Sequence, residues 1–179
     1  MTGLEELWLG KNKITELKVT LRLSNHHCSP LTSSFQNLSS LTSLKILSLQ
    51  SNRLPAITAL DSLATLEELY ISHNALTSIS GLSSNLSLRV LDISNNQIAH
   101  LNNLSHLTKL EELWASSNLL VSFEEVEQEL RDKEHLNTVY FEMNPMQLTN
   151  KVLYRNKVRL ALPQVQQIDA SEFPPRQRC

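Results

Sequence analysis

The stretch LEELYISHNAL at residues 66–76 combines four aliphatic residues and one asparagine in the pattern Leu-x-x-Leu-x-Ile-x-x-Asn-x-Leu. Related stretches recur along the chain, and their asparagines at positions 52, 74, 96 and 118 are 22 residues apart. Asn12 carries the same pattern, and Asn144 carries a variant with Leu136, Val139 and Phe141 at the aliphatic positions. Chance does not repeat such a pattern six times, so the chain consists of tandem repeats.

The spacing within one repeat predicts its local structure. Leu7 and Leu9 are two residues apart and share one face of a short strand, whereas Trp8 points the opposite way. Further aliphatic positions follow on the return path, and each coil needs its neighbours to complete its core. We predict an α/β leucine-rich-repeat solenoid. It has short parallel strands on the concave side, a 3-10 or irregular convex side because 22 residues leave no room for a full helix, and a C-terminal cap.

One position departs from the pattern, and one repeat is too long. Asn85 stands where the neighbouring repeats have leucine, and we expect Leu86 to take its core site through a local bulge. Asn12 and Asn52 are 40 residues apart, which is 18 more than one period. We therefore predict repeats over residues 1–144 with an out-of-register insertion at 19–36, a cap at 145–173 and a tail at 174–179.

The insertion has two interpretations. We favour a translated intron, because a valine codon begins with GT, the codon of Gln36 can be CAG, and residues 33–35 can encode a pyrimidine tract. The alternative is a functional loop, and sequencing of transcripts across residues 18–37 distinguishes the two. His26, His27 and Cys28 lie in this segment, but adjacent histidines with no fourth ligand predict no metal site.

The two ends of the repeat array differ. The spacing of Phe123, Val126 and Leu130 predicts a helix, and Arg131 and Lys133 after it suit the helix dipole. We expect the C-terminal end of the core to be closed by aliphatic residues of the cap, namely Val158, Leu160, Leu162, Val165 and Ile168. The N-terminal end begins with a standard coil at Leu4, so its core edge is open. We expect either that further coils precede it, which is the simpler account, or that another surface covers it.

The outward-facing strand residues form three columns with a distinctive composition. Together they contain five acidic residues and no lysine or arginine. The central column consists of Trp8, Ser48, Tyr70, Asp92, Trp114 and Tyr140. Exposed aromatic residues on a rigid sheet are typical anchors of protein interfaces, and the acids favour a partner with basic residues. The alternative is that the aromatic rings only shield neighbouring strands. An acidic face disfavours nucleic acid.

The rest of the sequence argues against other classes of protein. It contains no Gly-rich phosphate loop, no Gly-x-Ser-x-Gly motif and no convergent catalytic group, so we predict no enzyme activity and no cofactor. No apolar run is long enough for a membrane span. The net charge is -2, and two cysteines form no disulfide framework, which favours a reduced intracellular setting.

Several stretches resemble one known family. LEELWLGKNKIT (residues 4–15), TVYFEMNP (138–145) and YRNKVRLALPQVQQIDA (154–170) resemble the leucine-rich-repeat regulatory subunits of protein phosphatase 1. The resemblance implies a non-catalytic protein of nucleus and cytoplasm. It also implies a monomer that binds the phosphatase catalytic subunit through its concave face, with roles in the cell cycle and chromosome segregation.

The contacts that the resemblance carries over are Trp8, Asp92, Glu112, Trp114 and Tyr140. The columns themselves add Glu68 and Tyr70 to the predicted partner-binding set. The alternative function is a leucine-rich-repeat scaffold for another intracellular protein.

Overall fold

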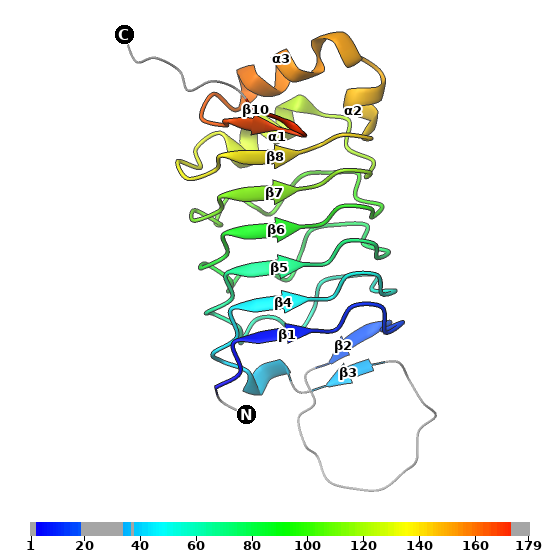
Figure 1. Ribbon diagram of the computed structural model, residues 1–179, viewed down its shortest axis with the longest axis vertical. Helices are drawn as coiled ribbons and strands as arrows, with labels where there is room; N and C mark the ends of the chain where they lie inside the picture. The colour runs from blue at the N-terminus through cyan, green and yellow to red at the C-terminus, as the bar shows by residue number, and fades with distance from the viewer. Residues whose placement is uncertain (1–2, 19–33, 37, 173–179) are drawn as a thin grey trace, which may run out of the picture.

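Stacked coils, each contributing one short strand to the same face, form the molecule (Figure 1). The computed structural model describes residues 3–18, 34–36 and 38–172. Neighbouring strands pair in parallel except the last two, which are antiparallel. In spatial order the sheet consists of β1 (Glu6–Trp8), β4 (Ile46–Ser48), β5 (Glu68–Tyr70), β6 (Val90–Asp92), β7 (Glu112–Trp114), β8 (Thr138–Tyr140), β9 (Gln167–Ile168) and β10 (Ser171–Glu172). This confirms the predicted leucine-rich-repeat solenoid.

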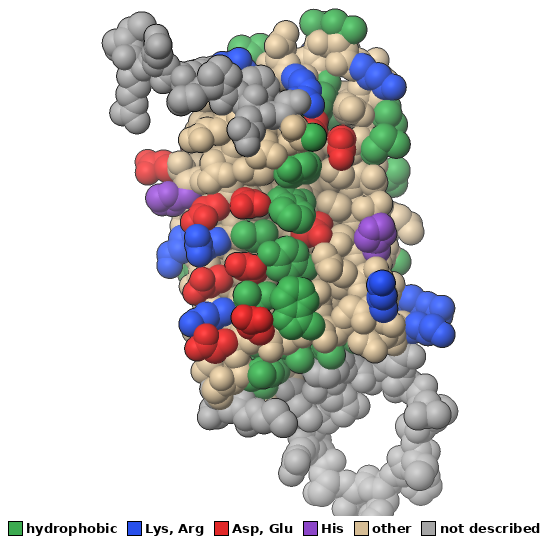
Figure 2. All heavy atoms as spheres, in the orientation of Figure 1, with side chains coloured by type: hydrophobic (Ala, Val, Ile, Leu, Met, Phe, Trp, Pro, Cys, Tyr) green, Lys and Arg blue, Asp and Glu red, His purple; other side chains and the backbone are tan. Residues whose placement is uncertain are grey.

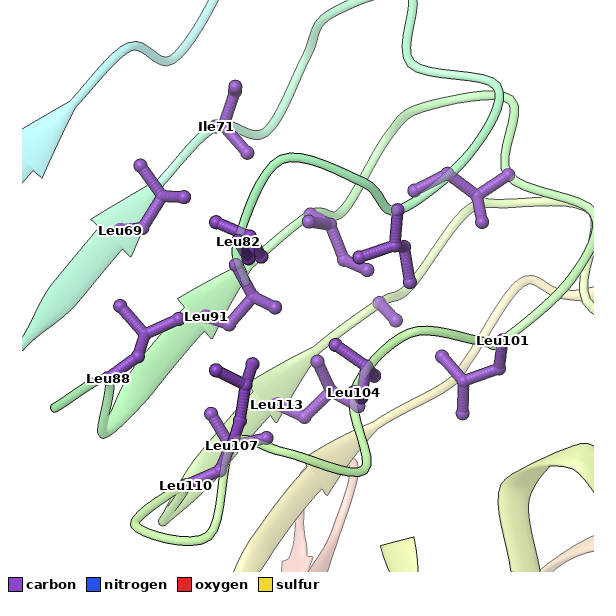
Figure 3. Close-up of a cluster of buried hydrophobic side chains, with 14 of the residues drawn as sticks. Leu69, Ile71, Leu82, Leu88, Leu91, Leu101, Leu104, Leu107, Leu110 and Leu113 are labelled. Atoms are coloured by element: carbon purple, nitrogen blue, oxygen red, sulfur yellow. The ribbon is translucent and has the colours of Figure 1, made fainter. Parts of the chain in front are cut away.

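The pairing register aligns equivalent residues of successive coils. Leu69 pairs with Leu91, which pairs with Leu113, and all three side chains are fully buried. Figure 3 shows that leucines from the strands and from the opposite turns meet in one continuous interior. Each fully buried leucine stabilises the fold by about 1.5–3 kcal/mol, so stacking supplies most of the stability. The residues on either side of each leucine point outward and form the strand face, the predicted concave side.

The repeated asparagines join the coils. The Asn96 side chain donates to the carbonyls of Ile93 in its own coil and Ile71 in the preceding one, at 2.9 and 3.2 Å. Its oxygen accepts from the N–H of Leu76 at 3.0 Å. The side chain thereby pairs buried backbone carbonyls and an N–H at the turn that no helix or β-sheet hydrogen bonds reach. The same arrangement recurs at Asn52, Asn74, Asn118 and Asn144.

The convex side is irregular, as predicted, with a 3-10 turn η1 at Leu38–Ser40. The prediction for Asn85 is wrong. Its side chain is fully buried and donates to the carbonyls of Leu60 and Leu63, at 3.1 and 2.9 Å, whereas Leu86 is 53% exposed. No bulge is required, because the asparagine pairs carbonyls of the preceding coil that a leucine would leave without a donor.

The predicted helix in the fifth coil is α1 (Phe123–Leu130), and Ser122 caps it by accepting from the N–H of Glu125. The predicted role of Lys133 at the helix dipole is wrong. Its side chain is 3% exposed, and its ammonium donates to the carbonyls of Leu104, Ser105 and Leu107 of the preceding coil. Lys133 therefore joins two convex turns, as Asn85 does two repeats earlier.

The long first repeat leaves the main sheet uninterrupted, because β1 pairs directly with β4. A separate parallel pair, β2 (Glu16–Lys18) with β3 (Ser34–Gln36), lies at the N-terminal end of the stack (Figure 1). Residues 34–36, the described part of the expected insertion, thus contribute no strand to the main sheet. Residues 19–33, including His26, His27 and Cys28, lie outside the described residues, as does residue 37.

At the C-terminal end, α2 (Pro145–Leu148), α3 (Lys151–Ala161) and β9 cover the last coil (Figure 1). Leu160 is 75% exposed, so its predicted place in the core is wrong. The segment is helical, and Tyr154, Val158 and Ala161 point inward instead. The other residues expected to close the core are buried as predicted: Val158, Leu162, Val165 and Ile168.

Candidate functional site

Aromatic side chains from four strands form a row along the strand face, which we call the aromatic ladder: Trp8, Tyr70, Trp114 and Tyr140. The ring centroids of Trp8 and Tyr70 are 6.4 Å apart, and those of Tyr70 and Trp114 are 6.3 Å apart. Trp114 and Tyr140 meet edge to face at 5.7 Å. Trp8 and Tyr70 lie two strands apart, or about 9.5 Å, so their rings must lean toward each other over the strand between them. The ladder is continuous (Figure 2).

The leaning rings cover the residues between them, which corrects one predicted contact. Asp92 was expected on an exposed ridge, but it is 4% exposed, and Ser48 on the other intervening strand is also buried. The Asp92 carboxylate accepts from the side-chain amide of Gln50 at 3.2 Å and from the N–H of Ser94 at 3.0 Å. Asp92 therefore fixes the floor beneath the rings and is not placed to contact a partner.

Each ring on the three strands with the sequence Glu-Leu-aromatic is held by the glutamate two residues before it. The Tyr70 hydroxyl donates to Glu68 at 2.7 Å, and the Trp114 indole donates to Glu112 at 3.0 Å. Trp8 donates to Glu6 in the same way at 3.3 Å. Burial, followed by the hydrogen bond to Glu68, raises the pKa of Tyr70 far above its ordinary value, so the hydroxyl stays a donor.

The paired glutamates of these strands have different electrostatic partners. Glu5, Glu67 and Glu111 lie just before the N-terminal ends of their strands, where Lys45 contacts Glu5 and Arg89 contacts both Glu67 and Glu111. Glu6, Glu68 and Glu112, which we call the acidic row, form no salt bridge with any lysine or arginine of the described residues. Figure 2 shows acidic side chains beside a hydrophobic strip that runs along the strand face.

The strand face also has a shallow hollow beside Trp114 and Tyr140. It has a volume of about 320 Å³, and Ser94, Ser116 and Glu142 line its other side. Gln167 of the cap fixes Tyr140 by donating to its hydroxyl at 2.6 Å. A partner side chain entering the hollow would meet two aromatic edges and a carboxylate. This surface favours a side chain that is apolar along its length and positively charged at its tip.

Most of the predicted partner-binding set lies together on the strand face. Trp8, Tyr70, Trp114 and Tyr140 form the ladder, and Glu68 and Glu112 form two of the three members of the acidic row. The column pattern predicted which strand positions face outward. It could not show that Gln50 and Gln167 hold members of the set, because both are ordinary polar residues in the sequence and act only through tertiary contacts.

Other kinds of site find no support in the described part of the chain. It contains no cluster of three or more histidine, cysteine, aspartate or glutamate side chains suited to a metal ion. None of its helices has the length and hydropathy needed to cross a bilayer.

Comparison with known proteins agrees with the fold. A family model described as leucine-rich repeats (two copies) matches residues 64–106. Solved structures similar to this chain include a leucine-rich-repeat protein of Leptospira interrogans, with a TM-score of 0.61, 24% identity, and coverage of 92% of this chain and 48% of that one. Internalin C2 of Listeria monocytogenes has a TM-score of 0.53 and 30% identity, covering 64% of this chain and 54% of the internalin.

A curated protein matches part of the sequence more strongly. The protein phosphatase 1 regulatory subunit SDS22 of Schizosaccharomyces pombe is 60% identical over 53 residues, which are 30% of this chain and 16% of that protein. The match is short, but it is much stronger than the general likeness between leucine-rich repeats, and it confirms the resemblance inferred from the sequence. This chain has the leucine-rich-repeat fold, and part of it is closely similar to a regulatory subunit of protein phosphatase 1.

Proposed function

We propose that this chain is a non-catalytic regulatory subunit that binds the catalytic subunit of protein phosphatase 1 through its strand face. The choice of partner rests on the 60% identity with a subunit of that name. The choice of surface rests on one observation: the aromatic ladder lies beside three glutamates that have no basic partner among the described residues.

The chemistry of the surface explains how a partner would be held. Rigid tryptophan and tyrosine rings lose little conformational entropy on binding and bury a large apolar area. The acidic row attracts lysine or arginine and increases the association rate. Each carboxylate is already oriented by the ring beside it, so part of the ordering cost is met before the partner arrives.

The proposal includes a biological setting that follows from the resemblance alone. It places the complex in the nucleus and cytoplasm, with one copy of this chain per catalytic subunit and roles in the cell cycle and chromosome segregation. The alternative is that the same face binds another intracellular protein with a basic surface. The general leucine-rich-repeat likeness supports that alternative equally well, whereas the 53-residue match favours the phosphatase.

A pulldown with purified phosphatase catalytic subunit tests the proposal. Trp114→Ala removes one ring of the ladder, and we expect binding to weaken by about 2 kcal/mol, or roughly 30-fold. Leu86→Ala is the matched control, because Leu86 is exposed away from the strand face. If both variants retain the phosphatase equally, the proposed binding surface is wrong. If the wild-type protein retains none, the proposed partner is wrong.

A further inference from the structure

Helix α3 has two apolar faces, and only one of them is used by the fold. Tyr154, Val158 and Ala161 are buried and close the end of the core. On the outer side, Val152 is 87% exposed and Leu160 is 75% exposed. A helix that only caps a core needs one apolar stripe and a polar outer surface. The outer aliphatic residues of α3 therefore have no role in the described fold.

These residues belong to a concentration of exposed aliphatic side chains at the end of the solenoid. Leu153, next to Val152, and Leu148 at the end of α2 are about half exposed. We call the four together the cap patch: Leu148, Val152, Leu153 and Leu160. Figure 2 shows hydrophobic side chains at this end of the molecule together with basic ones. Clustered exposed apolar residues with a charged rim are typical of interaction surfaces.

The charge of the cap is opposite to that of the strand face. Residues 145–161 contain four basic residues and no acidic one. Lys151 and Lys157 are exposed beside the cap patch, and Lys157 lies 5.1 Å from the ring centroid of Phe123. Arg155 is engaged with the carbonyl of Ile168. A partner that binds here must offer carboxylates near its apolar residues.

The local shape favours a protein segment over a lipid surface. A groove of about 320 Å³ runs between α1 and α3, with Phe123, Leu160 and Ala161 on its floor and sides. Glu124 and Glu127 line its α1 wall, so the carboxylates of a partner must lie on the α3 side of the groove. A groove of this size accommodates a protruding side chain, and Lys157 on its α3 wall is placed to meet an acidic residue beside that side chain.

We propose that the cap patch binds an acidic amphipathic helix of a second protein, independently of the strand face. The apolar stripe of that helix would cover Val152 and Leu160, and its glutamate or aspartate residues would contact Lys151 and Lys157. One chain could then hold two proteins at once, a basic one on the strand face and an acidic one on the cap. This inference does not depend on the identity of the strand-face partner.

Two designed peptides test the inference on the full chain. Both have leucines at positions i, i+3, i+4 and i+7, and the remaining positions are glutamate in one peptide and lysine in the other. Binding is measured by fluorescence anisotropy of the labelled peptide. The variant Val152→Asn/Leu160→Asn removes the centre of the cap patch without adding charge, and Leu86→Asn is the control for an exposed leucine elsewhere.

We expect the glutamate peptide to bind the wild-type chain and the Leu86→Asn control equally. The double variant should bind it at least about ten-fold more weakly, as the loss of two aliphatic contacts implies. The double variant should leave binding of the lysine peptide unchanged, because that peptide is complementary to the acidic row. Absence of glutamate-peptide binding, or equal binding by the double variant, would overturn the inference. Saturable binding to anionic vesicles that the double variant abolishes would assign the patch to membranes instead.

Discussion

The buried ammonium of Lys133 should be a major determinant of stability at the C-terminal end of the solenoid. Its bonds to the carbonyls of Leu104 and Leu107, at 2.7 and 3.0 Å, are buried, and the bond to Ser105 at 3.2 Å is partly buried. Lys133→Met keeps the aliphatic stem but leaves these carbonyls without a donor. Each buried unpaired carbonyl costs about 1–3 kcal/mol.

Part of that cost is offset, because methionine removes the desolvation of the ammonium that lowers the pKa of Lys133. We expect a net loss of about 2–3 kcal/mol in the free energy of unfolding. Urea unfolding followed by circular dichroism measures it, with Lys109→Met as the control, because Lys109 is exposed. If the two variants unfold within about 0.5 kcal/mol of each other, the assigned role of Lys133 is wrong.

Two further predictions concern a turn and an ion pair. Gly81→Ala should lower the free energy of unfolding by more than about 2 kcal/mol, because φ is +76° and the added Cβ would lie 2.3 Å from the carbonyl oxygen of Ile57. Gly3→Ala is the control: the space around Gly3 is open, so the same urea titration should show no change. Arg89, by donating to Glu111, lowers the pKa of that carboxyl from 4.5. This contribution to stability is present above pH 4.5 and is lost as the pH falls below it. As the pH falls, the free energy of unfolding of the wild-type protein should therefore decrease more than that of Glu111→Gln. The same decrease in both proteins would contradict the assignment.

The repeat pattern predicted the fold and the outward positions because both follow from a strict period. A 22-residue repeat with aliphatic residues two apart allows one arrangement of strands, and the helical spacing of Phe123, Val126 and Leu130 likewise identified α1. The out-of-register window is also visible as a departure from the period, and its bounds at 19–36 stay a prediction; β1 pairs with β4.

The errors arose where tertiary contacts decide the outcome. Val158, Leu160 and Leu162 alternate like a strand in the sequence, but the segment through residue 161 is helical, so Leu160 points to solvent. Asp92 belongs to an outward column, but rings from the two neighbouring strands lean over it. Asn85 is polar at a core position because two carbonyls of the preceding coil need a donor. None of these contacts can be read from spacing alone.

The central claim is that the acidic row recognises a basic phosphatase surface. Glu112 belongs to that row, whereas its neighbour Glu111 is paired with Arg89 at the N-terminal end of β7. Isothermal titration of purified phosphatase catalytic subunit into Glu112→Gln and Glu111→Gln compares two adjacent changes of equal charge. The account predicts clearly weaker binding for Glu112→Gln and nearly wild-type affinity for Glu111→Gln. Equal affinities for the two variants, or a larger loss for Glu111→Gln, would contradict it.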